Sequence, residues 1–139
     1  MPDYISKILI KLGIENWQMG LVITDDAGIQ RYNREWRGKD APTDVLSFVQ
    51  SDGEAVPNFP GVPVEAGDIV ISLETIRKNA LEWKSSYEEE LSRALIHGVL
   101  HLNGMDHPND DYTTGMLKLQ EELLASAGCL TKETNNGNL

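Results

Sequence analysis

Cysteine, long hydrophobic runs and basic residues are all scarce in this 139-residue chain, and each scarcity excludes a class of protein. The single cysteine, Cys129, cannot form an internal disulfide, which favours a reducing cytoplasm, and we interpret it as a small apolar packing residue. The apolar stretch 8–10 lies between Lys7 and Lys11 and is too short for a membrane span or a signal sequence. We therefore expect a cytoplasmic protein with no membrane partner.

The charge balance is strongly acidic, because 12 lysines and arginines stand against 22 aspartates and glutamates and give a formal net charge of -10. A broad, non-specific nucleic-acid surface is normally basic, so this balance argues against one, and we expect no DNA partner. A local cationic site is still compatible with the total, since acidic residues elsewhere can dominate it.

Four of the few cations gather in one short stretch, at Arg31, Arg34, Arg37 and Lys39. Arginine suits phosphate because its planar guanidinium donates two parallel hydrogen bonds. For Arg31 and Arg34 we favour a solvated helix face, whereas the spacing alone leaves the role of Arg37 open.

The hydrophobic content of 40% and the length predict one domain over residues 1–130, followed by a flexible polar tail at 131–139. Apolar residues recur at helical spacing in five segments: 4–12, 29–36, 73–83, 86–103 and 110–127. Strand patterns cover 17–24, 45–49 and 68–71. These elements predict an α+β fold, in which a small mixed sheet of three or four strands packs against about five helices.

Two further predictions concern a long loop and the start of the last helix. Residues 50–66 contain three prolines and two glycines and predict a long loop, which in a compact domain is often functional, for instance as a lid. The alternative is a short edge strand hidden near 62–64. Further along the chain, Asn109 or Asp110 is the expected N-cap of the last helix.

The three histidines of the chain, His97, His101 and His107, lie within eleven residues of one another. His97 and His101 are four residues apart on the predicted central helix, so their rings lie on one face and can bind one ion. Gly104 allows a sharp turn after the helix, and Pro108 biases His107 towards an extended backbone that holds it off the helix. Three imidazoles leave a fourth tetrahedral position for water, which is typical of a catalytic zinc site.

Two neighbouring residues bear on the mechanism. Gly98 occupies the position where H-E-x-x-H peptidases carry a general-base glutamate, which weakens a peptidase interpretation. Asp106 would either orient a histidine ring or bond its own backbone in a turn, and the residues alone leave both open. A purely structural metal is disfavoured because Asp106 is the only local candidate for a fourth ligand.

Three stretches together carry a resemblance to a known family. Residues 36–48 read W-R-G-K-D-A-P-T-D-V-L-S-F, residues 67–72 read G-D-I-V-I-S, and residues 97–107 read H-G-V-L-H-L-N-G-M-D-H. This combination resembles the YbeY family of metal-dependent endoribonucleases, over roughly residues 20–125. The chain departs from the commonest form of the pattern at Trp36 and Met105.

The resemblance implies a zinc ion bound by His97, His101 and His107, although nickel or another divalent metal would also fit in vitro. It implies that Arg37 is a catalytic residue that holds substrate phosphate, while Asp40 and the Thr43-Asp44 pair set the turn that brings Arg37 towards the metal. The implied activity is cleavage of single-stranded RNA by a metal-activated water, during ribosomal RNA maturation and ribosome quality control. The implied partners are ribosomal RNA and the ribosome or its small subunit.

The resemblance also suggests how an acidic protein would bind RNA: Arg37 and Lys39 form a local cleft beside the metal, and the acidic remainder faces solvent. Two alternatives stay open. One is another metallohydrolase, such as a peptidase, and the other is a ribosome-assembly binding factor whose metal only stabilises its fold.

Overall fold

The computed structural model describes residues 1–50 and 61–130, and within them it contains five helices and three strands. In chain order these are α1 (Pro2–Lys11), β1 (Trp17–Thr24), α2 (Asp26–Arg37), β2 (Val45–Val49), β3 (Val64–Ser72), α3 (Leu73–Glu82), α4 (Tyr87–Leu102) and α5 (Gly115–Ala127). The predicted α+β fold with a small mixed sheet and five helices is thus confirmed. Among the described residues, no helix is both long and apolar enough to span a membrane.

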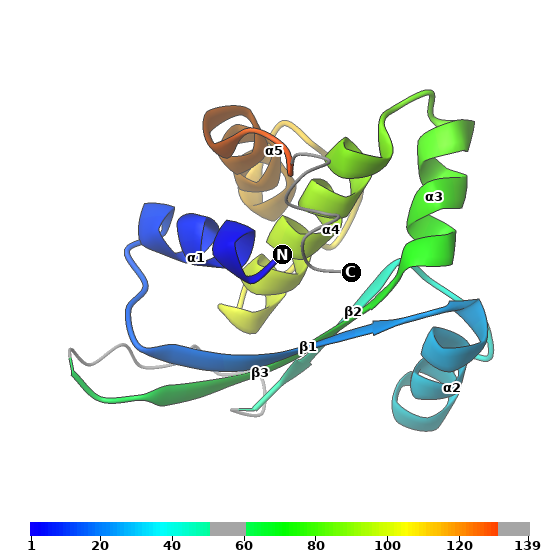
Figure 1. The fold of residues 1–139 in the computed structure, drawn as a ribbon, viewed down its shortest axis with the longest axis horizontal. Helices are drawn as coiled ribbons and strands as arrows, with labels where there is room; N and C mark the ends of the chain where they lie inside the picture. Colours follow the sequence, from blue (N-terminus) through cyan, green and yellow to red (C-terminus); the bar gives the residue numbers. More distant parts are fainter. Residues whose placement is uncertain (51–60, 131–139) are drawn as a thin grey trace.

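The sheet has the order β1-β3-β2, with β3 in the centre. β1 runs parallel to β3 and β2 runs antiparallel to it. Figure 1 shows α1, α3, α4 and α5 on one face of the sheet and α2 on the other, near one end of the strands. These four helices form a layer that covers one face of the sheet, and the candidate site lies where this layer meets the sheet.

The helix α4 is the centre of the molecule, because it packs against β2, β3, α1, α3 and α5. Its leucine, isoleucine and valine side chains are at most 1% exposed; they are Leu91, Leu95, Ile96, Val99, Leu100 and Leu102. The Ser86 hydroxyl accepts a hydrogen bond from the Glu89 backbone N–H at 3.0 Å and so caps the helix at the first residue of the predicted segment 86–103. The reciprocal half of a capping box is not formed, since the Glu89 carboxylate accepts instead from the Ser85 hydroxyl.

Gly98 allows α4 to lie unusually close to the sheet. A Cβ atom added at this position would lie 2.9 Å from Cδ1 of Ile69 and 3.1 Å from its Cγ2. Ser47 of β2 donates its hydroxyl to the carbonyl oxygen of Gly98 at 3.2 Å and ties the helix to the sheet at the same level. Gly98, which follows His97, therefore faces β3, where there is no space for a longer side chain.

Part of the predicted loop at 50–66 is wrong, and part of it lies outside the described residues. Residues 51–60 are not described, but β3 begins at Val64 rather than at Asp68, and it is the central strand rather than an edge. Val64 and Glu65 pair with Trp17 and Gln18 of β1, and the register then shifts before Gly67, whose φ is 135°. Pairing with a distant strand, which no local pattern reveals, thus makes these residues a strand.

The predicted start of the last helix is also wrong. Thr114 is the N-cap of α5, not Asn109 or Asp110. The side chain of Asn109 accepts from the Asp111 backbone N–H, and the side chain of Asp111 accepts from that of Thr113, both at 2.9 Å. Each of these acceptors thereby closes a local turn, and the helix starts only after the turns.

The C-terminal end of the described chain corrects the interpretation of the cysteine. Cys129 is exposed, so it is not a packing residue. The following residue, Leu130, is buried at 4% exposure, and its backbone N–H donates to the Ser92 hydroxyl at 2.8 Å. The extended segment after α5 turns Leu130 inward and its neighbour outward. The predicted flexible tail at 131–139 lies outside the described residues.

Candidate metal centre

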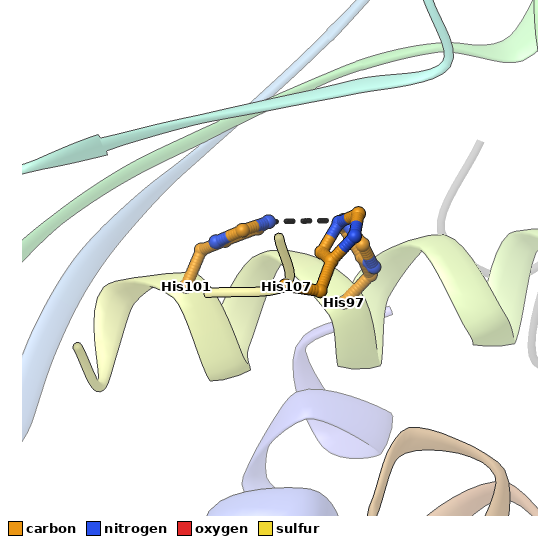
Figure 2. A group of neighbouring side chains, drawn as sticks. All are labelled: His97, His101 and His107. Atoms are coloured by element: carbon orange, nitrogen blue, oxygen red, sulfur yellow. Dashed lines mark hydrogen bonds between the residues drawn. The ribbon is translucent and has the colours of Figure 1, made fainter. Parts of the chain in front are cut away.

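The three histidines come together on one side of α4. His97 and His101 project from successive turns of this helix, and His107 returns from the segment that follows it (Figure 2). Gly104 makes the return by adopting a φ of 85°, in the left-handed region that glycine favours, as its place in the sequence predicts. One candidate ligand nitrogen from each ring lies within 4.8 Å of the other two.

Two of the three pairs of rings meet edge to face, and the third pair is tilted. The ring centroids of His97 and His101 are 4.6 Å apart with an interplanar angle of 77°, and those of His97 and His107 are 5.1 Å apart at 68°. The third pair, His101 and His107, is separated by 5.6 Å. Three rings that present edges to a common point are arranged as ligands of one ion are.

An oxygen atom lies next to the Nδ1 atom of each ring. Nδ1 of His101 lies 3.0 Å from the carbonyl oxygen of Met105, and Nδ1 of His107 lies 3.2 Å from that of Asn109. A carbonyl oxygen only accepts hydrogen bonds, so these contacts favour, for both rings, the tautomer with the proton on Nδ1 and the lone pair on Nε2. Nδ1 of His97 lies 2.6 Å from the side-chain oxygen Oε1 of Gln120.

The inner nitrogens fit a metal ion. Nε2 of His97 and Nε2 of His101 are 3.0 Å apart, the contact drawn as a dashed line in Figure 2. Metal–nitrogen bonds of about 2.0–2.1 Å in a tetrahedral site would hold two ligand nitrogens roughly 3.3 Å apart. Two lone pairs that face each other at this separation repel unless a cation lies between them. Within the described residues these histidines form the one cluster of ligand side chains found, and they are positioned to bind a metal ion.

The environment keeps two of the rings neutral. Burial lowers the pKa of His97 below the ordinary histidine value, against the hydrogen bond that the ring makes to the Gln120 side-chain oxygen, which raises it. Burial also lowers the pKa of His101, and the neighbouring His97 lowers it further. Neutral imidazole is the form that binds a metal, so the pocket favours the ligand form of both side chains at neutral pH.

His97 and His101 line a cleft of about 410 Å³ between β2 and the end of α4. Its lining comprises Arg37, Val45, Leu46, Ser47, Val49, His97, His101, Gly104, Met105 and Asp106. Arg37 reaches this cleft from the end of α2, which is closed by Gly38 at a φ of 72°. The fold therefore brings Arg37 and two of the histidines to one cleft, although about 60 residues separate them along the chain.

The guanidinium group of Arg37 is held in place by β2. It donates a hydrogen bond to the carbonyl oxygen of Ser47, and its Cζ lies 5.1 Å from the centre of the Phe48 ring. A guanidinium group has five N–H donors. The hydrogen bond to Ser47 uses one of them, so other donors of Arg37 can bind a ligand in the cleft. Arg34, one turn earlier, is exposed and forms an ion pair with Asp40 at 3.5 Å. It therefore lies on a solvated helix face, as predicted.

The turns around the site involve Asp44 and Asp106. Asp44 accepts from the backbone N–H of Val45 at 2.8 Å, and its carbonyl oxygen accepts from the Ser72 N–H at 2.9 Å, so it fixes the start of β2. The carboxylate of Asp106 accepts from the backbone N–H of His107 at 2.8 Å, and its charge acts on His97 and His101 by raising their pKa values rather than through a hydrogen bond to a ring. Of the two interpretations of Asp106, the structure therefore supports the turn residue.

Comparison with known proteins identifies the family. Residues 3–128 match the sequence profile of the family described as Endoribonuclease YbeY. This chain belongs to the YbeY endoribonuclease family. It is 48% identical over 124 residues to Endoribonuclease YbeY of Treponema denticola, an alignment that covers 89% of this chain and 79% of that protein.

Other relatives and one solved structure agree with this assignment. The chain is 43% identical over 125 residues to Endoribonuclease YbeY of Treponema pallidum strain Nichols, covering 90% of this chain and 78% of the relative. The solution structure of TM1509 from Thermotoga maritima is similar with a TM-score of 0.62 and 27% identity, and the match covers 91% of this chain and 77% of that one. The resemblance inferred from the three sequence stretches is thus confirmed.

One residue at the site was not anticipated from the sequence. Gln120 of α5 lies against His97. No local motif marks it as a site residue, because its neighbours in sequence are ordinary helix formers. A signal was present: Gln120 falls at helical spacing with Met116, Leu123 and Ala127, on the face predicted to be apolar. A polar residue at a core position is informative in itself, because its burial requires a hydrogen-bond partner.

Proposed function

We propose that this chain is a zinc-dependent endoribonuclease that cleaves single-stranded RNA during ribosomal RNA maturation and ribosome quality control in the cytoplasm. The cluster of three histidines, two of which line one cleft together with Arg37, supports the proposal most directly, in a chain whose family is named for endoribonuclease activity. Ribosomal RNA and the ribosome or its small subunit are the partners that this function requires.

The mechanism assigns separate work to the two groups of side chains. His97, His101 and His107 would hold the ion through Nε2, because Nδ1 of each ring is next to an oxygen. When bound, a zinc ion polarises phosphoryl oxygens and activates water for hydrolysis. Arg37 would bind the phosphate, because it lines the cleft, has N–H donors besides the one bonded to Ser47, and carries a guanidinium fork that matches the geometry of a phosphodiester.

The position of Gly98 favours this substrate over a peptide. In H-E-x-x-H peptidases the residue after the first histidine supplies a general base. Here that residue lies against Ile69 of β3, where even a Cβ atom would be 2.9 Å from the nearest side-chain carbon. No carboxylate can reach the cleft from this position, whereas the cationic side chain of Arg37 lines it.

The proposal is tested by cleavage of a defined single-stranded RNA, with a double-stranded RNA of the same sequence as the specificity control. We expect the wild-type protein to cleave the single strand, to lose activity in a chelator and to recover it with zinc. His97→Ala should be inactive under all three conditions, and cleavage that persists in this variant would come from a contaminating nuclease.

The same experiment separates the enzyme from a ribosome-assembly factor with a structural metal. An enzyme keeps most of its fold when the metal is removed, and the apolar core described above contains no metal ligand. A structural metal would instead lower the melting temperature strongly on removal, with no RNA cleavage by the metal-loaded protein. That pair of results would contradict the proposed function.

A further inference from the structure

The side chain of Gln120 lies inside the molecule, between α5 and α4, and is 2% exposed. A primary amide in such a place is costly unless both of its ends are hydrogen-bonded. Both ends of Gln120 have partners. Its oxygen Oε1 lies 2.6 Å from Nδ1 of His97, and its nitrogen Nε2 donates to Oε2 of Glu121 at 3.1 Å.

The partner of the amide nitrogen decides which way the amide points. Glu121 receives two hydrogen bonds from Arg93, one from Nε at 2.9 Å and one from Nη2 at 3.0 Å. Burial raises the pKa of Glu121, but the hydrogen bonds from Arg93 and Gln120 outweigh it and hold the pKa below its usual value. The carboxylate is therefore ionised and only accepts hydrogen bonds, so the NH₂ end of Gln120 must face it.

Arg93 is itself fixed within α4. It is 24% exposed and forms an ion pair with Glu90, whose side chain is 6% exposed. Because Arg93 spans from Glu90 on α4 to Glu121 on α5, the ion pairs connect the two helices beside the histidine cluster. The orientation of the amide is thus set by a chain of contacts that begins at a buried carboxylate.

The consequence falls on His97. With its NH₂ end committed to Glu121, Gln120 presents its carbonyl oxygen to the imidazole, and a carbonyl oxygen requires a donor. Nδ1 of His97 must then carry the ring proton, which leaves the lone pair on Nε2, the atom 3.0 Å from Nε2 of His101. Without this acceptor the ring could carry its proton on Nε2 and would present no lone pair to a metal.

We propose that Gln120 is a positioning residue that holds His97 as its Nδ1–H tautomer, and that Glu121 and Arg93 fix the direction of the Gln120 amide. His101 and His107 use backbone carbonyl oxygens for the same purpose, so His97 is the ligand whose tautomer depends on a side chain. The inference rests on the metal centre of the proposed function. Partners of this kind change metal affinity by about 10- to 100-fold.

The first test reads the tautomer directly, by ¹⁵N NMR of the histidine rings in metal-free protein at about pH 8, above the ordinary histidine pKa. We expect the wild-type protein to show His97 as the Nδ1–H form. Gln120→Met, which keeps the length and unbranched shape of the side chain but removes the acceptor, should shift His97 towards the Nε2–H form. Gln120→Glu restores an acceptor and should retain the Nδ1–H form.

The second test measures the zinc dissociation constant of the same proteins by competition with a chelator of known affinity. Gln120→Met should weaken zinc binding by about 10- to 100-fold, and Gln120→Glu should stay within a few-fold of the wild type. Glu121→Ala, which frees the amide to turn over, should have a smaller effect in the same direction. Lys118→Met changes an exposed position of the same helix and should change neither quantity.

A merely structural role of Gln120 is excluded by Leu123→Ala, which loosens the packing of α5 without touching the hydrogen bonds. This variant should lower the melting temperature but leave the His97 tautomer and the zinc affinity unchanged. The inference is overturned if Gln120→Met retains the Nδ1–H form, or if Leu123→Ala reproduces its effects. Because no RNA is used, a failure of RNA cleavage would contradict the proposed function and leave this inference standing.

Discussion

Arg37 combines an anchored guanidinium with exposure to the cleft that holds the histidines. Its hydrogen bond to the Ser47 carbonyl and its position over Phe48 limit its motion, so its free donors are already placed before a substrate arrives. Preorganised donors of this kind act mainly on the charge that develops at a reacting phosphate. No metal ligand depends on Arg37, because the Nδ1 partners of the three histidines come from Met105, Asn109 and Gln120.

We therefore expect Arg37→Ala to lower kcat/KM for RNA cleavage by about a hundredfold or more, with zinc content and melting temperature close to those of the wild type. Arg37→Lys keeps the charge but loses the bidentate fork and should be intermediate. Arg34→Ala, on the same helix but paired with Asp40 in solvent, is the matched control and should be nearly fully active. Loss of zinc in Arg37→Ala, or unchanged cleavage, would contradict the role assigned to Arg37.

At the scale of the elements, the site depends on how closely α4 approaches the sheet. Gly98 and Ile69 bring helix and strand together, and the Ser47 hydroxyl bonds the Gly98 carbonyl at this point. Because His97 immediately precedes Gly98, the depth at which the helix sits also sets the position of His97 relative to the β2 side of the cleft. Packing and site geometry are therefore coupled through one glycine.

Gly98→Ala should destabilise the protein, because the added methyl group overpacks the interface with Ile69 at a cost of about 1–3 kcal/mol. The gain in helix propensity from glycine to alanine, about 1 kcal/mol, works in the opposite direction, so the net loss of stability should be up to about 2 kcal/mol. Chemical denaturation gives the free energy of unfolding, and RNA cleavage at fixed zinc should fall with it.

Ile69→Val provides the matched control for this clash, because it removes the carbon atom that lies 2.9 Å from the added methyl group. We expect the double variant Gly98→Ala, Ile69→Val to be more stable than the sum of the two single changes predicts. Strict additivity would show that the methyl group is accommodated elsewhere and that the close approach of α4 to β3 is not limiting.

At the scale of the whole molecule, the histidines make the free energy of unfolding depend on pH. Burial lowers the pKa of His97 and of His101 in the folded protein. The relevant pH window runs from the ordinary histidine pKa of about 6.5 in the unfolded chain down to the lowered pKa values in the folded protein. Within this window the unfolded chain binds more protons than the folded one. The free energy of unfolding of the metal-free protein should therefore be highest above this window and fall as the pH falls through it.

The measurement is chemical denaturation of metal-free protein between about pH 8 and pH 5, with wild type and His97→Gln compared. The variant lacks one of the two shifted histidines, so its stability should fall less steeply, by no more than about 1.4 kcal/mol per pH unit. Asp26, whose pKa is lowered to about 2 mainly by Lys78 and Thr75, titrates below this window and does not interfere. Equal slopes for the two proteins would contradict the prediction.

Local patterns were sufficient for most elements of the fold. The i, i+4 pair of histidines, the Ser86 cap and Gly104 each act within a few residues, so α4 and the return of His107 followed from them. The period-2 pattern of β1 was also correct for Trp17, Met19 and Leu21, which pack against the core, although Ile23 at the strand end is 41% exposed. Short-range geometry determines these features because backbone dihedrals and side-chain periodicity are local properties.

The features that the sequence did not reveal all depend on contacts between distant segments. Val64 is in a strand because it lies beside Trp17, and Cys129 is exposed because its neighbour Leu130 is the residue that packs inward. Gln120 and Glu121 acquire their roles only where α5 meets α4. Each is an ordinary residue in its own segment, and only the packing of a second segment gives it a partner.

The sequence by itself determined which residues could bind a metal, since three neutral imidazoles at this spacing on a helix followed by a glycine turn need little else to meet. Only the tertiary structure decided what surrounds them. It placed Arg37 on the same cleft, put Gly98 against the sheet, and set Gln120 against His97. The reason is physical: a ligand set can be encoded within one turn and one loop, whereas burial, tautomer and substrate contact depend on elements that meet only when the chain folds.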